Sequence, residues 1–354
     1  METIWFCLVA LMIALYVVLD GFDLGAGAIH LLVARSDEER RQVLASIGPV
    51  WDGNEVWLLA AGGALYFAFP ALYASGFSGF YLPLMMVLWL LILRGISIAF
   101  RGHIQSAIWD RLWDFVFCAS SLLLAIFYGA ALGNVVRGVP LDGSGYFFEP
   151  LWTNFRLGQD TGILDWYTIL VGVLALAALV MHGALWVQMK TSGRVSERAT
   201  RIAGIAWWVV VMLTLLVTAV TFTVQPQVKQ NFSTWPWGVV FPLLAVTGAG
   251  VVKFALGKKD EPKAFLASAA YLIGMLTSVV FGVYPMVLPA RNPLYSLTAA
   301  NAKAGAYGLK VGLVWWTLGM ILAAGYFTFL YRSFAGKVTA ETIPHASGDS
   351  AGSV

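Results

Sequence analysis

The sequence alternates between long apolar stretches and polar segments from its first residues to about residue 337. A helix that crosses a membrane needs roughly 20 consecutive, mostly apolar residues. Nine stretches meet this requirement, so the pattern predicts nine membrane-spanning helices. We place them at 3–33, 51–73, 77–100, 112–136, 163–188, 202–224, 236–257, 264–288 and 309–331.

The composition excludes an ordinary soluble domain. Hydrophobic residues make up 59% of the chain and charged residues 12%, against roughly half and a quarter in soluble proteins. A soluble protein of this size cannot bury that much apolar surface. The net charge of +3 is too small to indicate binding to nucleic acid. We therefore expect an all-α polytopic membrane protein in contact with lipid.

The longest segment on the outer side divides the predicted fold. It follows the fourth span, contains Gly, Pro, Asn and Asp, and has no long apolar run. This predicts two four-helix bundles plus one peripheral helix. The expected units are a first bundle at 1–140, an external loop at 141–162, a second bundle at 163–290, a ninth span at 291–337 and a disordered cytoplasmic tail at 338–354.

The orientation follows from the Lys and Arg residues between the spans, because cytoplasmic loops are enriched in them. Fifteen Lys and Arg residues lie in the first loop, in every second segment after it and in the tail. Six lie in the segments between these. This predicts an outside N-terminus and a cytoplasmic C-terminus. The apolar N-terminus lacks a basic start and a small-residue cleavage site, so we expect a retained first span.

A first acidic motif lies inside the first span. Asp20 and Asp23 are three residues apart, which places both carboxylates on one helical face. Asp20 lies about 25 Å along the helix, in the cytoplasmic half. A charge at this depth usually faces the protein interior or water. The alternative is an interfacial cap near a helix break.

A second acidic motif opens the second span. Asp52 is followed three residues later by Glu55, which is the spacing of a helix-capping arrangement. Asp52 is therefore a candidate N-cap. Because this span enters from the cytoplasm, the same acids could join Asp20 and Asp23 in a proton-uptake route. Trp51 and Trp57 have the pattern of interface anchors.

Arg94 lies near the inner end of the third span. It could pair with one of the acidic residues, or its side chain could extend to the interface. The sequence leaves both alternatives open.

The sequence gives no sign of a redox metal in this chain. His182 is the only histidine well inside a predicted span, and a lone histidine is more often a hydrogen-bonded packing residue. Cys7 and Cys118 lie in apolar runs without a metal or redox spacing, so we expect buried free thiols. No covalent-haem, Walker or dinucleotide motif is found.

With these motifs the chain resembles subunit II of the cytochrome bd-type quinol oxidases, over residues 15–140 above all. The resemblance does not decide between the typical and the cyanide-insensitive branch. The matching motifs are DGFDLG at 20–25, WDGNEVW at 51–57, AGGAL at 61–65, SGFY at 78–81, the segment 94–101 and GNVVRGVP at 133–140.

The resemblance implies a respiratory complex in a bacterial cytoplasmic (inner) membrane. A haem-bearing subunit I would hold haem b558, haem b595, haem d and the quinol site, and a small single-span subunit often joins it. The complex would oxidise quinol and reduce dioxygen to water. This chain would bind no haem itself, and a structural quinone or lipid in it stays an open question.

The resemblance also assigns roles to individual residues. Asp20, Asp23 and Asp52 would belong to a proton route at the subunit interface, and Trp57 would lie near an oxygen route. Members of the family often have Gln where this chain has Glu55, which adds a carboxylate to the route.

Two other hypotheses fit the topology. The chain could be a secondary transporter that uses Asp20, Asp23 and Asp52 for proton coupling, although such sites usually lie near mid-membrane at the interface of two repeats. It could also be an assembly subunit in which the acids are caps and packing contacts.

Overall fold

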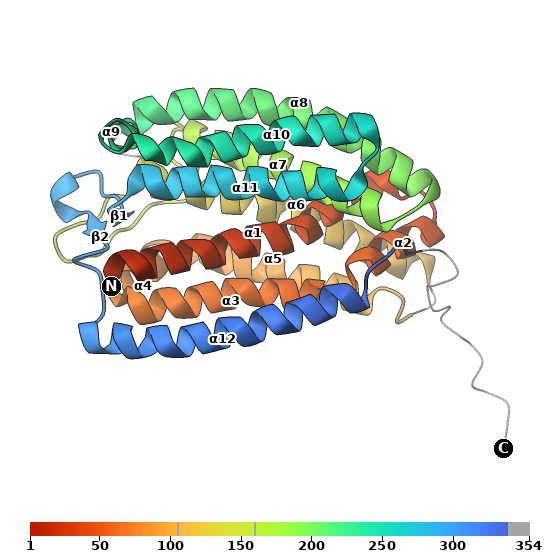
Figure 1. The fold of residues 1–354 in the computed structure, drawn as a ribbon, viewed down its shortest axis with the longest axis horizontal. Helices are drawn as coiled ribbons and strands as arrows, with labels where there is room; N and C mark the ends of the chain where they lie inside the picture. The colour runs from red at the N-terminus through yellow and green to blue at the C-terminus, as the bar shows by residue number, and fades with distance from the viewer. Residues whose placement is uncertain (105, 159–160, 339–354) are drawn as a thin grey trace, which may run out of the picture.

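The computed structural model describes residues 1–104, 106–158 and 161–338, and most of them are helical (Figure 1). Residues 339–354, which make up most of the predicted tail, lie outside the described residues. The helices are α1 Glu2–Val33, α2 Asp37–Ile47, α3 Trp51–Ala68, α4 Pro70–Gly79, α5 Tyr81–Phe100, α6 Ala107–Arg137, α7 Trp166–Lys190, α8 Gly193–Val224, α9 Pro226–Thr234, α10 Val240–Lys258, α11 Glu261–Val283 and α12 Ala306–Ser333, with 3₁₀ turns η1 Pro236–Val239 and η2 Pro293–Tyr295 and strands β1 Met286–Leu288 and β2 Leu297–Thr298.

The prediction of an all-α polytopic membrane protein is confirmed. Eight helices of the described chain are long and apolar enough to cross a membrane, namely α1, α5, α6, α7, α8, α10 with η1, α11 and α12. α3 is the exception, because its 18 residues include Asp52, Asn54 and Glu55. It nevertheless runs alongside α1 and α12 (Figure 1).

The predicted second and third spans have different ends in the structure. Proline has no N–H to donate within a helix, and Pro70 ends α3 at Ala68 and begins the short helix α4. The predicted spans 51–73 and 77–100 therefore become α3, α4 and α5, with a further break at Phe80. α4 carries the chain across the end of the bundle.

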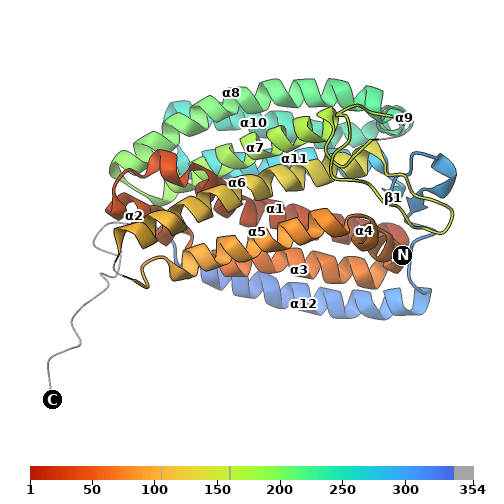
Figure 2. The ribbon, with the colours of Figure 1, turned by 180° about the vertical axis from the view of Figure 1, so that it is seen from behind.

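The segments between the helices gather at the two ends of the molecule. We call one the amino end, because it holds Met1 and the hairpin β1–β2, and the other the α2 end (Figures 1 and 2). At the amino end Lys303 pairs with Glu2 at 3.2 Å. At the α2 end Lys337 pairs with Glu261 at 2.7 Å. The grouping matches the predicted alternation of loops.

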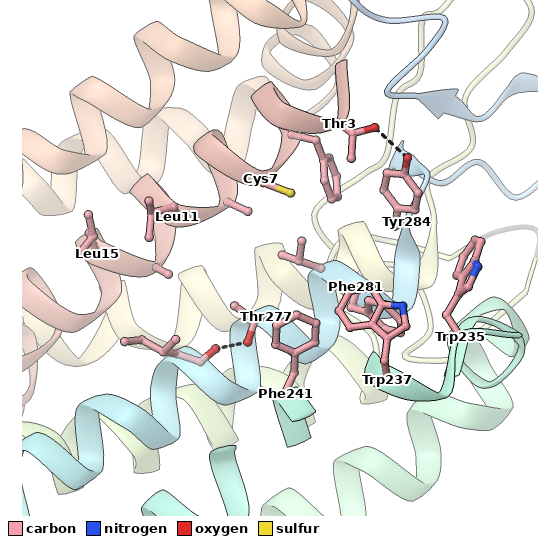
Figure 3. Close-up of a pocket in the computed structure, with 15 residues that line it drawn as sticks. Thr3, Cys7, Leu11, Leu15, Trp235, Trp237, Phe241, Thr277, Phe281 and Tyr284 are labelled. Atoms are coloured by element: carbon pink, nitrogen blue, oxygen red, sulfur yellow. Dashed lines mark hydrogen bonds between the residues drawn. The ribbon is translucent and has the colours of Figure 1, made fainter. Parts of the chain in front are cut away.

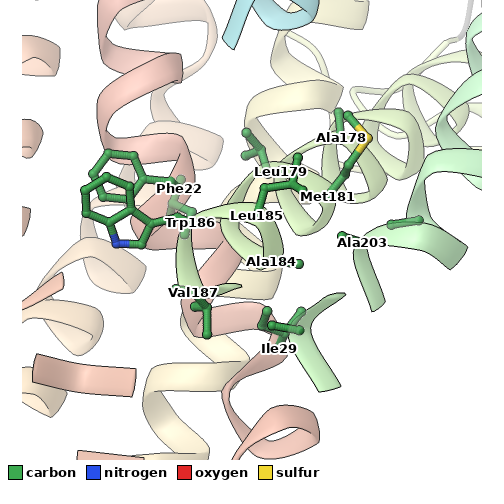
Figure 4. Packing of buried hydrophobic residues seen from close by; sticks show 14 of the residues in the cluster. Phe22, Ile29, Ala178, Leu179, Met181, Ala184, Leu185, Trp186, Val187 and Ala203 are labelled. Carbon is green, nitrogen blue, oxygen red and sulfur yellow. The ribbon is translucent and has the colours of Figure 1, made fainter. Parts of the chain in front are cut away.

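α1 is the central helix and packs against α3, α6, α7 and α11. Phe22 lies flat against Trp186 of α7, with ring centroids 3.9 Å apart (Figure 4). The α1 and α7 backbones touch, since a Cβ added at Gly25 would lie 1.9 Å from the Leu179 carbonyl oxygen. Small residues allow such close approach in membranes. This crossing holds α1, which carries the acidic motif, in the middle of the molecule.

α12 is the outermost helix, and no part of its most apolar segment is buried within the chain. It lies along α3, where Phe327 packs against Trp57 at 5.5 Å between ring centroids. Its exposed apolar residues face lipid or a partner. The division into two four-helix bundles and a peripheral helix stays a prediction.

Candidate functional site

One face of α1 carries a line of small and polar residues toward α3, α5 and α6. Tyr16, Asp20, Asp23, Gly27 and His30 are spaced by three or four residues, which places them on one side of a helix. All five are buried, although an acidic side chain is normally exposed. Their partners come from helices far apart in the sequence.

Asp20, Arg94 and Glu55 form the first group, which we call the Asp20 cluster. The Arg94 guanidinium donates two hydrogen bonds to the Asp20 carboxylate, at 2.9 and 2.6 Å, and one to Glu55 at 3.2 Å. Asp20 and Arg94 are fully buried, whereas the Glu55 side chain is 24% exposed. Of the two alternatives for Arg94, the structure has the ion pair.

Asp23, Asn54 and Tyr331 form the second group, the Asp23 cluster. The Asn54 amide donates to Asp23 Oδ2 at 2.8 Å, and the Tyr331 hydroxyl donates to the Asn54 carbonyl oxygen at 2.8 Å. The groups come from α1, α3 and α12. Within the described chain, Asp23 Oδ1 is buried and has no hydrogen-bond partner.

Asp52 is not a helix cap. α3 begins at Trp51 with Val50 as its N-cap, so Asp52 lies inside the first turn, and Glu55 pairs with Arg94 instead of closing a capping box. The Asp52 side chain is exposed at the α2 end, and no hydrogen bond or ion pair joins it to the part of the chain that the structure describes. The structure therefore brings Asp20, Asp23 and Glu55 together, and leaves Asp52 at the surface beside them.

Trp57 lies inside the molecule, 7% exposed, and not at an interface as its pattern suggested. It packs with Tyr16 and Met12 of α1 and with Ala61 of its own helix. Its indole nitrogen has no partner among the described residues. Its role in an oxygen route stays a prediction.

A further charged group at the α2 end was not predicted. Asp114 of α6 accepts hydrogen bonds from His30 Nε2 at 2.9 Å, Arg40 at 3.0 Å and Arg101 at 2.6 Å, and we call these four residues the Asp114 cluster. Arg101 also pairs with Asp37 of α2 at 2.6 Å. His30 and Asp114 both fell inside predicted spans, which was a usable signal, because ionisable residues are rare there.

A second unpredicted network lies at the amino end, where α6 ends and α7 begins. Arg137 donates to Glu149 at 2.9 Å, and it also pairs with Asp165, the N-cap of α7. Arg291 pairs with the same Glu149. Burial raises the pKa of Glu149, although Arg137 and Arg291 oppose the shift. These contacts fasten the segment around Glu149 to the ends of α6 and α7 and to Arg291 in the hairpin.

His182 is a packing residue, as expected. Both its ring nitrogens have partners, the Ser268 hydroxyl at 2.6 Å and the Val18 carbonyl at 2.9 Å, and the ring stacks on Phe265. Among residues 1–104, 106–158 and 161–338, no group of three or more His, Cys, Asp or Glu side chains could hold a metal ion.

The two cysteines are free, but the expectation that both are buried is wrong. Cys7 is exposed and Cys118 is half-buried. Cys7 is exposed because it lies in the wall of an open pocket beside α1, whereas the partly buried Cys118 thiol faces α1 and donates to the Ala28 carbonyl at 3.4 Å.

An apolar pocket of about 450 Å³ opens between α1, η1 and α11 near the amino end (Figure 3). Its wall includes Leu11, Trp237 and Phe281, which are apolar or aromatic. At one end the hydroxyl groups of Thr3 and Tyr284 lie 3.0 Å apart. The pocket is thus suited to a long apolar molecule with a small polar end.

The chain is similar to proteins of one family along almost its whole length. Residues 1–334 match the family model described as cytochrome bd terminal oxidase subunit II. A probable cytochrome oxidase subunit 2 from Haemophilus influenzae is 31% identical, with 96% of each chain covered. The cytochrome bd-I ubiquinol oxidase subunit 2 of Escherichia coli is 30% identical, also with 96% of each covered. The cytochrome bd ubiquinol oxidase subunit 2 of Bacillus subtilis is 30% identical, with 88% of this chain and 89% of the relative covered.

The fold is also found in a solved structure. A chain of the bd oxidase from Geobacillus thermodenitrificans superposes with a TM-score of 0.73, covering 94% of this chain and 98% of that chain at 18% identity. The secondary-transporter hypothesis has no support in these comparisons. The chain belongs to the cytochrome bd terminal oxidase subunit II family.

Proposed function

We propose that this chain is the haem-free companion of a haem-bearing subunit I in a quinol oxidase, and that it supplies protons for the reduction of dioxygen to water. Subunit I would hold haem b558, haem b595 and haem d, and a small single-span subunit would complete the complex. The proposal is supported by the relatives from Escherichia coli and Bacillus subtilis, which are described as subunits of ubiquinol oxidases.

The observation that carries the proton role is the burial of Asp20 and Asp23 side by side on α1, at 0% and 1% exposure. Burying a carboxylate is costly even when it is paired. An apolar helix could pack here without these groups, so their presence favours a functional role. Asp20 is held by Arg94, whereas Asp23 accepts only a neutral amide, which leaves Asp23 as the better proton acceptor.

The route that we propose begins at the α2 end, which we assign to the cytoplasm because the more basic loops gather there. The N-terminus is then outside and the C-terminus inside. Asp52 would collect protons at the surface, and Glu55 would link it with Asp20 and Asp23. Glu55 is the partly exposed member of the Asp20 cluster, so subunit I would bind on that side. Trp57, next to Tyr16, would line the oxygen route.

Asp52→Asn tests the surface end of this route. Because Asp52 is exposed and holds no other residue in place, we expect the complex to assemble with its full haem content. Quinol-driven oxygen consumption should fall about two- to fivefold, less than the roughly hundredfold contribution of a directly acting acid or base. Oxygen uptake is measured between pH 6 and pH 8. The control is Glu197→Gln, which replaces an exposed carboxylate at the α2 end.

Three outcomes would contradict parts of the proposal. Turnover of Asp52→Asn equal to that of Glu197→Gln at every pH would remove Asp52 from the route. Purification of the chain alone from its native membrane, without a haem-containing partner or quinol oxidase activity, would overturn the assignment to an oxidase. Loss of haem in Asp52→Asn would point to a structural role instead.

We further propose that the pocket between α1, η1 and α11 holds a membrane lipid or quinone, with its polar end at Thr3 and Tyr284. The apolar wall supports this occupant, since ligand pockets of this kind bury an apolar body and fix it by a few polar groups. Leu11→Trp should fill the pocket. Mass spectrometry of the extracted complex should then find one lipid or quinone fewer per complex, and an unchanged content would contradict the proposal. The mass identifies which of the two is bound.

A further inference from the structure

Three buried polar atoms lie along α1 between the Asp23 cluster and the Asp114 cluster. They are Asp23 Oδ1, the Ser121 hydroxyl and His30 Nδ1, and within the described residues none has a hydrogen-bond partner. The three side chains are at most 1% exposed. Buried polar atoms in folded proteins are almost always hydrogen-bonded, to protein or to ordered water. Three such atoms in one line indicate bound water.

Ser121 of α6 lies midway along this line. It contacts α1 at Gly27, where an added Cβ would lie 2.1 Å from the Ser121 oxygen. Gly27 is four residues from Asp23 and three from His30, or roughly 6 Å and 4.5 Å along the helix axis. One water molecule can bridge each of these two distances, because it makes two hydrogen bonds of about 2.8 Å each.

The surroundings restrict the line to a narrow path. The ring of Phe117 would lie 3.0 Å from a Cβ at Gly27 and packs edge-on against His30, with ring centroids 5.4 Å apart. The path would therefore hold water in single file. The end of the path at His30 is polar. The charged groups that face His30 are Asp114 of α6, Arg40 of α2 and Arg101, which directly follows α5.

The hydrogen bond to Asp114 orients the histidine. An ionised carboxylate can only accept, so the nitrogen that faces Asp114 carries a proton. The other nitrogen, Nδ1, is buried without a partner among the described residues, so it is free to exchange a proton with water, and His30 lies three residues along α1 from Gly27, which Ser121 contacts. Histidine suits this task because each of its two ring nitrogens can bind or release a proton.

We propose that water bound between His30, Ser121 and Asp23 forms a second proton-uptake branch, which runs inside this chain from the α2 end to Asp23. A proton leaves Nδ1 of the His30 imidazolium for the first water. The water molecules and the Ser121 hydroxyl each give up one proton as they gain one, and Asp23 Oδ1 becomes protonated. The imidazole keeps its other proton on Nε2. The ring then turns over, so that its free nitrogen takes the next proton from the α2 end.

This branch rests on the proposed function, and the neighbouring serines Ser120 and Ser121 offer a matched test. The Ser120 hydroxyl donates to the Val116 carbonyl of its own helix, so Ser120→Ala removes a buried hydroxyl outside the path. In the complete complex, Ser121→Ala should slow oxygen reduction about threefold and enlarge its solvent isotope effect, with unchanged haem content. Ser120→Ala should change neither quantity. Equal behaviour of the two variants would overturn the branch.

The histidines give an independent pair. His30→Gln can still donate to Asp114 but cannot carry a proton, whereas His182→Gln alters a buried histidine whose two nitrogens both have partners. We expect slower proton uptake from the cytoplasmic side only in His30→Gln. If Asp23→Asn blocks turnover while Ser121→Ala and His30→Gln do not, the branch fails and the proposed function stands. If Asp23→Asn also has no effect, the proposed function itself fails.

Discussion

Arg94→Met is expected to destabilise the folded chain by about 3–5 kcal/mol, because it leaves the Asp20 carboxylate buried without its charge partner. Asp20 receives two hydrogen bonds from this guanidinium and has 0% exposure, so water cannot replace them cheaply. The amount of intact complex after solubilisation should fall sharply. Size-exclusion chromatography followed at the haem absorbance, together with the apparent Tm, measures the loss.

The double variant Asp20→Asn/Arg94→Met separates charge from packing. Replacing a buried ion pair by neutral groups is often far less harmful than breaking it, so we expect most of the lost stability to return. Oxygen reduction by the double variant should nevertheless be slow, since Asp20→Asn removes a carboxylate of the proposed proton route. Arg111→Met, at an exposed arginine of α6 near the same end, is the control. If the Arg94→Met complex is as stable as this control, the ion pair between Asp20 and Arg94 does not stabilise the folded chain.

The sequence predicted which residues are buried better than it predicted their partners. The spacing of Asp20 and Asp23 within an apolar stretch was enough to place both on an interior face of α1. The choice of partner was not readable, since Arg94 lies 74 residues from Asp20 and could equally have extended to the interface. The Tyr331 hydroxyl, 277 residues from Asn54, follows from how α12 packs on α3, which no local pattern encodes.

The sequence was also misleading where two local rules competed. At Asp52 the capping spacing with Glu55 was satisfied, but α3 begins at Trp51, two residues earlier than a cap at Asp52 requires, and Glu55 pairs with Arg94 instead. At Pro70 the hydropathy pattern extends the second span past a residue that cannot continue the hydrogen-bond ladder of α3. Hydropathy records where a segment can lie in lipid, whereas caps and ion pairs depend on which neighbours it meets.

Asp23→Asn should reduce oxygen turnover by about tenfold or more while leaving the assembled complex and its haem content unchanged. The amide oxygen of the new side chain can still accept the hydrogen bond from Asn54, so packing and pairing are retained. What is lost is the capacity to bind and release a proton, which is worth roughly a hundredfold or more when a group acts directly. Quinol-driven oxygen consumption and its solvent isotope effect are the measurements.

Conservative replacement decides whether the carboxylate itself is needed. Asp23→Glu keeps the acid and should recover part of the turnover that Asp23→Asn loses, even though the longer side chain disturbs the contact with Asn54. Glu197→Gln, which removes an exposed carboxylate at the same end of the molecule, should have no effect. Full turnover in Asp23→Asn would exclude Asp23 from proton delivery. Equal losses in the Asn and Glu variants would mean that the geometry at α3, and not the titratable group, limits the reaction.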